Sequence, residues 1–182
     1  MPSLSRVNPR FTARFEIIDG GSGQFSGVMS EPSSGEMPAS QFTYARRQLR
    51  VDAKSPVAAG MVVRDSDGTP FLLAEHGNSE SRGTTLFRSL RMFQLTKQYP
   101  HQVREKRVDP ITQLDYDIGL SAEVPIWGAY EPTAEQAGGA IPVKFETGRF
   151  ITGVEVALDE IVDGKQVTRV DRQLGVYMLT LG

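Results

Sequence analysis

The chain contains no cysteine, which excludes disulfide bonds, zinc sites built on thiolates and cysteine nucleophiles. Long apolar runs are also missing. No stretch approaches the length that a helix needs to span a bilayer, and residues 1–6 lack the continuous apolar segment of a signal peptide. These absences predict a protein that is neither secreted nor inserted in a membrane, and they fit assembly in a reducing cytoplasm.

Charge is nearly balanced overall but unevenly distributed. The formal net charge of the 182 residues is −2. The segment Arg82–Arg107 holds seven basic residues and one acidic residue, a net charge of +6. From Val108 onward, twelve acidic residues outnumber five basic ones, a net charge of −7. This polarity is compatible with a head-to-tail contact between copies, which generates rings, or with charges that only coat solvated faces.

Turn chemistry and apolar alternation predict strands. Two short apolar runs flank Asp67-Gly68 within Met61–Glu75, and Asp-Gly favours the tight two-residue turn of a β-hairpin. Asp163-Gly164 predicts a second hairpin turn. Period-two alternation in the last third of the chain predicts an antiparallel meander. The strands expected there are Ile141–Glu146, Phe150–Leu158, Lys165–Asp171 and Gly175–Leu181.

Two further stretches are expected to be strands. Val124–Tyr130 carries the only tryptophan, and Thr84–Lys97 is assigned as a strand although its apolar spacing also suits a helix. Several short strands separated by turns indicate a mainly β protein. We therefore predict a small antiparallel β-barrel or sandwich with long loops, formed by one β domain over residues 46–182.

Residues 1–45 are expected to form an extended N-terminal arm. They contain one plausible strand, Ala13–Ile18, and then a stretch over residues 30–40 that is rich in Ser, Pro and Gly and cannot bury enough apolar surface to fold alone. Isolated apolar residues in such a segment indicate either anchors on a neighbouring molecule or a loop that lies on its own domain. The candidate arm anchors are Phe15, Phe25, Met29 and Phe42.

The residues give little support for catalysis or metal binding. Residues 65–68 begin like a calcium loop but lack its later ligands, and a turn explains the same residues. Glu75, His76 and His101 have no spacing typical of a zinc site. We therefore predict that the chain is not an enzyme and binds no metal or cofactor.

Basic residues in the middle of the chain are the remaining candidates for binding. They could contact phosphates or an acidic protein neighbour. No recognition helix or RNA-binding signature accompanies them, so any contact with DNA is expected to be independent of sequence. We assign them to a protein interface first and to a DNA channel second; they are Arg88, Arg91, Arg104, Lys106 and Arg107.

Two stretches resemble the head-completion or head-to-tail connector proteins of tailed bacteriophages. In Val57–Glu75, an apolar pair precedes Asp-x-x-Gly and the chain returns as Phe71-Leu72-Leu73. The second stretch, Leu86–Tyr130, adds Arg104, the turn Asp109–Thr112 and the strand Pro125–Trp127. The resemblance implies a virion structural protein, assembled in the host cytoplasm, that forms a ring below the portal and continues the DNA channel into the tail.

The resemblance also implies partners. These are other copies of the chain in the ring, the portal, tail or collar proteins, and passing DNA, with no membrane contact. In that case the arm would anchor on a neighbour, and the basic residues would face an adjacent ring or the channel. From the residues alone, the alternative is a monomeric β-barrel binding module for a small ligand, a peptide or a nucleic acid.

Overall fold

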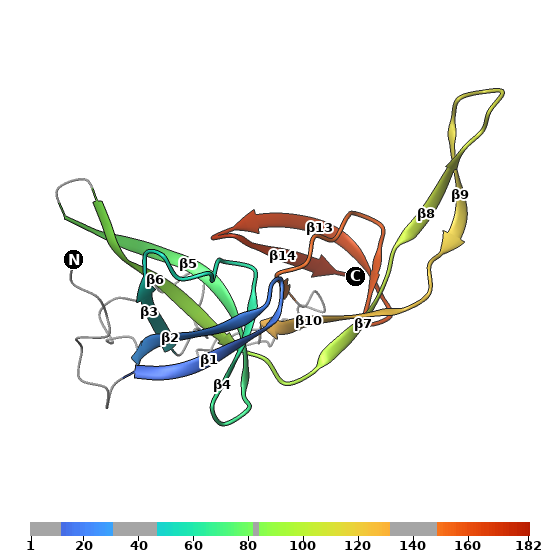
Figure 1. The fold of residues 1–182 in the computed structure, drawn as a ribbon. Coiled ribbons are helices and arrows are strands. Elements are labelled where there is room, and N and C mark those ends of the chain that lie inside the picture. The colour runs from blue at the N-terminus through green and yellow to red at the C-terminus, as the bar shows by residue number, and fades with distance from the viewer. Residues whose placement is uncertain (1–11, 31–46, 82–83, 132–148) are drawn as a thin grey trace, which may run out of the picture. The chain divides into compact units, whose positions relative to one another are not determined.

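The computed structural model describes residues 12–30, 47–81, 84–131 and 149–182, and every regular element in these ranges is a strand. The strands form two closed six-stranded antiparallel barrels and one separate two-stranded sheet (Figure 1). The mainly β fold class is confirmed, and the barrel is the form it takes. The chain divides into two compact units, residues 1–96 with 173–176 and residues 97–172 with 177–182.

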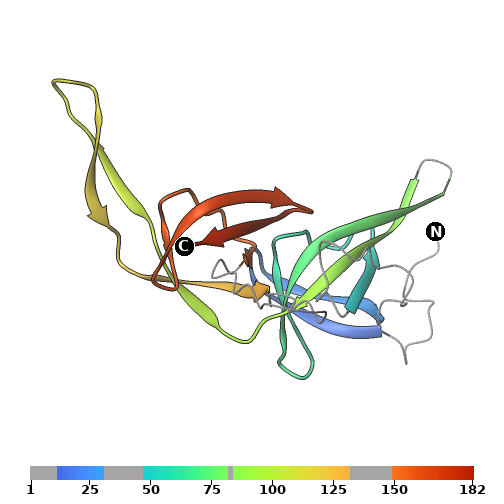
Figure 2. The ribbon, with the colours of Figure 1, turned by 180° about the vertical axis from the view of Figure 1, so that it is seen from behind.

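The first barrel is built from the six N-terminal strands, in the order β1-β2-β3-β6-β5-β4, and is closed by pairing of β4 with β1. The β5–β6 hairpin is longer than its neighbours, and β3 pairs only with the part of β6 from Phe87 to Met92 (Figure 2). The strands are β1 Thr12–Asp19, β2 Gly23–Ser30, β3 Arg47–Asp52, β4 Val62–Asp65, β5 Pro70–Ser81 and β6 Thr84–Gln94.

Alternate residues of the first barrel fill its core. On β1, Phe15 and Ile17 point inward, and Phe15 pairs with Phe25 of β2 so that the two rings stack with centroids 5.3 Å apart. β3 contributes Leu49 and Val51, both fully buried. Residues 12–30 are therefore part of this barrel, and the expected arm over residues 1–45 is corrected for them. Residues 1–11 and 31–46 lie outside the described ranges.

The physical reason for this correction is that a strand needs few apolar residues when its neighbours supply the rest of the core. The segment Gly23–Ser30 has only Phe25 fully in the core, with Met29 packed at its margin. Gly27 faces Leu49 and the carbonyl of Arg50, so this strand contributes close backbone approach instead of bulk. Local composition could not reveal those cross-strand partners.

The second barrel has the order β10-β11-β14-β13-β12-β7 and is closed by pairing of β7 with β10. Between β7 and β10 the chain forms the separate β8–β9 sheet. The single β domain expected over residues 46–182 is thus two barrels, each with its own core. The strands are β7 Gln98–Gln102, β8 Arg104–Val108, β9 Asp115–Leu120, β10 Val124–Glu131, β11 Arg149–Thr152, β12 Ile161–Val162, β13 Lys165–Gln173 and β14 Val176–Leu181.

An aromatic cluster occupies the core of the second barrel. Tyr99, Tyr130 and Phe150 meet edge to face, with ring centroids 5.0 to 5.4 Å apart. The Tyr130 hydroxyl donates a hydrogen bond of 2.8 Å to the Asp163 carboxylate. Burial raises the pKa of the Tyr130 phenol, and the bond to Asp163 adds to the rise. The cluster joins β7, β10 and β11, so it ties together the strands that carry the β8–β9 hairpin.

The hairpin turns agree with the sequence in part. Asp163 and Gly164 both have positive φ, 53° and 74°, as a tight primed turn requires, so this turn is confirmed. At Asp67-Gly68 only the glycine has a positive φ, at 84°. The Asp65 N–H donates to the Thr69 carbonyl, so the strands are joined by a three-residue loop. The Asp65 carboxylate accepts the N–H groups of Asp67 and Thr69, which stabilises this longer loop.

Most of the expected strands are present. Thr84–Lys97 is a strand over Thr84–Gln94, and β10, β13 and β14 lie at the expected positions. In Phe150–Leu158, only residues up to Thr152 belong to a strand. In the last third, β12, β13 and β14 are neighbours in chain order, as in a meander, but β11 pairs with β14 instead of with β12. Ile141–Glu146 lies outside the described ranges.

Gly128 provides a test of packing in the second barrel. A β-carbon at this position on β10 would lie 2.8 Å from the Ile151 carbonyl and would also meet the end of the Phe150 ring. We expect Gly128→Ala to lower the free energy of unfolding by about 1 to 3 kcal/mol. In a Phe150→Leu background the added loss should be smaller, because the ring end is gone. Urea unfolding followed by circular dichroism and by Trp127 fluorescence measures both values.

Gly27→Ala is the matched control. Its β-carbon would crowd Leu49 and Arg50 in the first barrel, so its effect should simply add to that of Phe150→Leu. An equal loss for Gly128→Ala with and without the Phe150 ring would contradict the assigned packing.

Candidate interaction surface on the β8–β9 hairpin

The β8–β9 hairpin continues the β7–β10 pair beyond its barrel (Figure 1). Val124 pairs with His101 inside the barrel, and Leu120 pairs with Arg104 outside it. Between them, the Ser121 N–H donates to the Val103 carbonyl at 2.9 Å, and the Ser121 hydroxyl accepts the Val103 N–H. One two-stranded ribbon therefore runs from the barrel wall into solvent.

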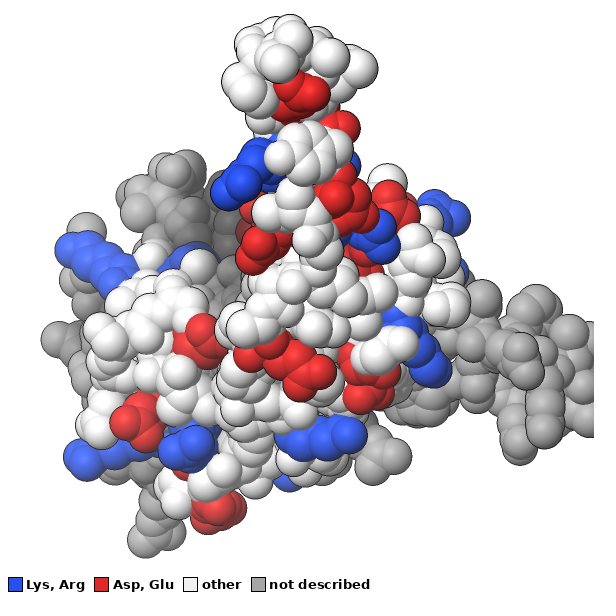
Figure 3. All heavy atoms as spheres, turned by 90° about the vertical axis from the view of Figure 1, so that its right-hand side faces the viewer, with Lys and Arg blue, Asp and Glu red and all other residues white. Residues whose placement is uncertain are grey.

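Many large apolar side chains on this ribbon are exposed. Ile111 and Leu114, in the loop that joins the two strands, are 89% and 68% exposed. Single exposed apolar residues are common, but a group of them on one projecting element indicates an interaction site. The atoms at the outer end of the hairpin are mostly uncharged, whereas acidic and basic residues alternate below it (Figure 3). The other exposed apolar residues here are Val103, Val108, Tyr116, Ile118, Leu120 and Val124.

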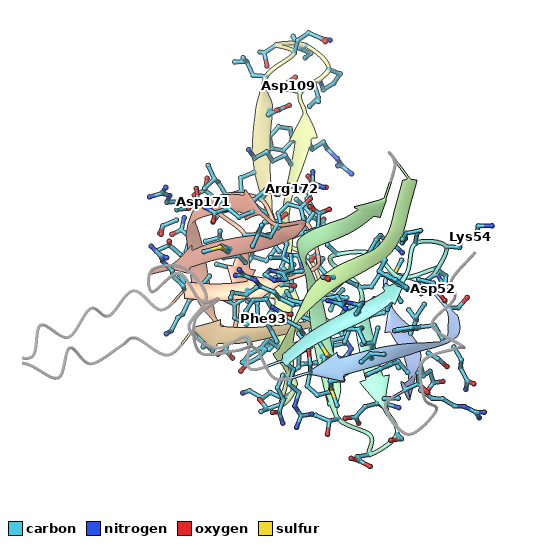
Figure 4. The ribbon with its side chains drawn as sticks, turned by 90° about the vertical axis from the view of Figure 1, so that its left-hand side faces the viewer. Asp52, Lys54, Phe93, Asp109, Asp171 and Arg172 are labelled. Atoms are coloured by element: carbon cyan, nitrogen blue, oxygen red, sulfur yellow. The ribbon has the colours of Figure 1, made fainter. Side chains whose placement is uncertain are left out.

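Asp109 organises the loop at the outer end of the hairpin (Figure 4). Its carboxylate accepts the N–H groups of Ile111 at 2.7 Å and Thr112 at 3.3 Å. Its carbonyl accepts the Gln113 N–H, and its own N–H donates to Leu114. The two carboxylate hydrogen bonds, from Ile111 first, lower the pKa of Asp109. The backbone that carries the exposed side chains of this loop is thus held by hydrogen bonds.

Charged residues stabilise the stem of the hairpin. The Gly119 N–H donates to Asp117, whose carboxylate also pairs with Arg104, and these contacts lower the pKa of Asp117 in that order. Arg104 also donates to the carbonyl of Asp159, in the connection between β11 and β12 of the barrel. Ile118 is an extra residue in β9, because Glu105 pairs with Gly119 and Lys106 with Asp117. The stem is therefore joined to its barrel through Arg104.

The predicted basic residues fall into two groups. Arg104, Lys106 and Arg107 lie together on β8, within the candidate surface. Arg88 and Arg91 lie on β6 of the first barrel. There, Arg88 donates to the carbonyl of Ser55 at 2.6 Å, and Arg91 donates to the His76 ring at 3.2 Å. Both thus have partners in their own barrel, and they are not part of the hairpin surface.

The predicted arm anchors are distributed differently from the expectation. Phe15 and Phe25 are core residues of their own barrel, which corrects their assignment to an interface with a neighbour. Met29 is partly buried against the same core, and its sulfur accepts a hydrogen bond from Arg47. Phe42 lies outside the described ranges.

Both histidines have partners that explain their positions. His101 and Glu160 form a buried pair with 2.9 Å between Nε2 and Oε2, and the Ala157 N–H donates to the same oxygen. His76 lies between Arg91 and Gln48. Nδ1 of His76 accepts from Arg91, and the side-chain nitrogen of Gln48 lies 2.8 Å from its Nε2. Within the described ranges, no three potential ligands are grouped to hold a metal.

Comparisons with known proteins found no similarity: no family model, curated protein or solved structure matches the chain. The described part of the chain has no helix long and apolar enough to cross a membrane.

The apolar part of this surface was missed in the sequence, although a signal was present. The sequence predicts the turn at Asp109–Thr112 but gives Ile111 and Leu114 no role of their own. Arg104–Val108 offers only one apolar residue, so it cannot form a core face. A strand without a core face, followed by a turn with bulky apolar residues, indicates a projecting hairpin.

The role of Asp109 can be tested through the amides that it binds. We expect Asp109→Ala to speed hydrogen exchange at Ile111 and Thr112 by roughly two- to tenfold, because each loses an acceptor. Amide exchange measured by NMR gives these rates. Asp109→Asn, which keeps an acceptor oxygen, is the control and should have the smaller effect.

The lowered pKa of Asp109 also determines how the stability of the loop depends on pH. The charged carboxylate stabilises the loop, so its contribution is complete above the ordinary carboxyl pKa and is lost as the pH falls through the lowered value. An NMR titration follows the chemical shift of the Asp109 carboxyl carbon. The chemical shifts of the loop amides should change with the same midpoint pH. A midpoint at or above the ordinary aspartate value would contradict the hydrogen bonds.

Proposed function

We propose that the chain is a virion structural protein of a tailed bacteriophage, a head-to-tail connector or head-completion component. In this function it forms a ring that joins the portal to the tail and continues the DNA channel. The observation that carries the proposal is the β8–β9 hairpin, which exposes Ile111 and Leu114 on a loop fixed by Asp109. The resemblance of Val57–Glu75 and Leu86–Tyr130 to connector proteins gives the biological setting.

The hairpin supports an assembly function for a physical reason. Exposed apolar side chains cost free energy in water, and burying them against a partner recovers it at about 25 cal/mol per Å². The hydrogen bonds of Asp109 hold the loop before binding, so less conformational entropy is lost in the complex. A projecting ribbon of this kind is suited to insertion into a neighbouring protein.

The proposal names three kinds of partner. The first is another copy of the chain in a ring, and the second is a portal, tail or collar protein that receives the hairpin. The third is passing DNA, which Arg104, Lys106 and Arg107 on β8 would contact without reading its sequence. The proposed location is the virion, after assembly in the host cytoplasm.

One observation favours the alternative function, a monomeric binding module. The strands β1 and β2 pack fully into their own barrel, so residues 12–30 no longer support an arm that needs a neighbour. Each barrel has a complete core of its own. A monomer that binds a small ligand, a peptide or a nucleic acid would have the same fold, and the difference between the two functions lies in what the hairpin binds.

The connector function predicts that the hairpin loop is required for assembly. We expect Ile111→Asp/Leu114→Asp to weaken binding to the portal or tail protein encoded in the same phage genome by about tenfold or more, as for central interface residues. Co-expression, light scattering and negative-stain imaging of the full chain measure binding and ring formation.

Leu158→Asp is the control for this test, because Leu158 is 58% exposed but lies outside the hairpin. It should leave assembly unchanged. A wild-type chain that stays monomeric and binds neither portal nor tail protein would refute the connector and favour the binding module.

A further inference from the structure

Both long edges of the β8–β9 hairpin lack a neighbouring strand within the described ranges. The Asp109 N–H bonds to Leu114, and the Ser121 N–H bonds to Val103, so these residues turn their backbone groups toward each other. In an antiparallel pair, the N–H and C=O groups of successive residues point alternately toward the partner strand and toward the open edge. The direction of these groups is therefore known for the residues in between. The outward groups belong to Arg104, Lys106 and Val108 on β8 and to Asp115, Asp117 and Leu120 on β9.

The two edges carry opposite charge. β8 has three basic residues and one acidic residue, and β9 has two acidic residues and no basic one. Lys106 pairs with Asp117, and Val108 with Asp115, so these side chains share one face of the ribbon. On that face Arg104 and Lys106 form a basic row along β8, beside the acidic row of Asp115 and Asp117 along β9, whereas Arg107 lies on the opposite face.

We infer that the hairpin binds a second copy of this chain, with the β8 edge of one copy paired to the β9 edge of the next. The inference deepens the proposed connector function and rests on it, since that function requires copies to assemble. In this contact the outward backbone groups of Lys106 and Val108 gain partners, and the acidic row of each copy lies between two basic rows. The sheet that results is antiparallel throughout, because β8 and β9 run in opposite directions.

Charge repulsion disfavours the two symmetric contacts between copies, β8 with β8 and β9 with β9. Pairing β8 with β8 would place Lys106 and Arg107 beside their own copies, and pairing β9 with β9 would place Asp115 and Asp117 together. Like charges on directly opposed residues are destabilising. The contact is therefore head to tail, and such contacts close into rings when the rotation allows.

Exposed apolar residues of the ribbon add to the same contact. Tyr116 pairs with Arg107 on the face opposite the charged rows, and Ile118 follows it two residues later. Both side chains are about half exposed in the single chain. In a continuous sheet they would pack against the adjoining ribbon, whereas Ile111 and Leu114 in the loop stay available for a different protein.

A reversed ribbon tests the inference. The variant Arg104→Glu/Lys106→Glu/Asp115→Lys/Asp117→Lys exchanges the charges of the two edges and keeps an opposite-charge pair at positions 104 and 117. It should associate with itself like the wild type, but it should not mix with the wild type, because each mixed contact places like charges together. Variants that carry only the β8 or only the β9 reversal should associate about tenfold more weakly or worse. Native mass spectrometry of differently labelled full chains, with light scattering, measures association and mixing.

The matched control is Arg50→Glu/Lys54→Glu, which reverses two exposed charges on the first barrel (Figure 4). It should associate and mix freely with the wild type. Free mixing of the reversed ribbon with the wild type, or full association of the single-edge variants, would overturn the inference. Rings and portal binding would then persist, and the connector function would stand.

A wild-type chain that stays monomeric at high concentration would also overturn the inference. Its binding to the portal or tail protein would then decide the connector function separately. Because the chain has no native cysteine, Val108→Cys and Asp115→Cys provide a second test. A mixture of the two should form a disulfide that joins one chain of each kind, and a Val108→Cys homodimer would contradict the head-to-tail order.

Discussion

The pairing of β7 with β10 closes the second barrel and also supports the hairpin on which the proposed function depends. Inside the barrel, Tyr99, His101 and Ile126 turn their side chains into a packed interior. Outside it, the same two-stranded pairing continues through β8 and β9 with no core beneath it. Strand pairing satisfies backbone hydrogen bonds without requiring burial of side chains, so an ordered ribbon can keep its apolar residues in water.

Because both barrels are closed, few strands have an edge at which another chain could pair. Strand segments that are paired on both sides within a closed barrel leave no backbone groups open to another chain, although the β5–β6 hairpin extends beyond the segments paired with β3 and β4. The β8–β9 hairpin is different, because each of its strands has one neighbour among the described strands. Its loop carries exposed apolar residues and its stem carries two edges of opposite charge. The loop and the stem thus offer separate surfaces for a heterologous partner and for a second copy.

The N-terminal segment shows why local composition was misleading. The sequence assigns Phe25 and Met29 to an arm as isolated apolar residues, yet β1 and β3 on either side of Gly23–Ser30 provide the side chains that complete the core. For the basic residues, proximity in the sequence did not indicate a shared surface. Arg88 and Arg104 are close in sequence, but one binds a carbonyl in the first barrel and the other belongs to the stem of the hairpin.

The sequence by itself determined the strands and turns whose signals are local. Asp163-Gly164 fixes its own turn, and the alternation in Lys165–Asp171 and Gly175–Leu181 identifies β13 and β14. Only the tertiary structure decided that β11 pairs with β14, that the strands close into two barrels, and that Phe15 is buried while Ile111 is exposed. Alternation assigns a side chain to one face of a strand, but what covers that face is set by residues far away in the chain.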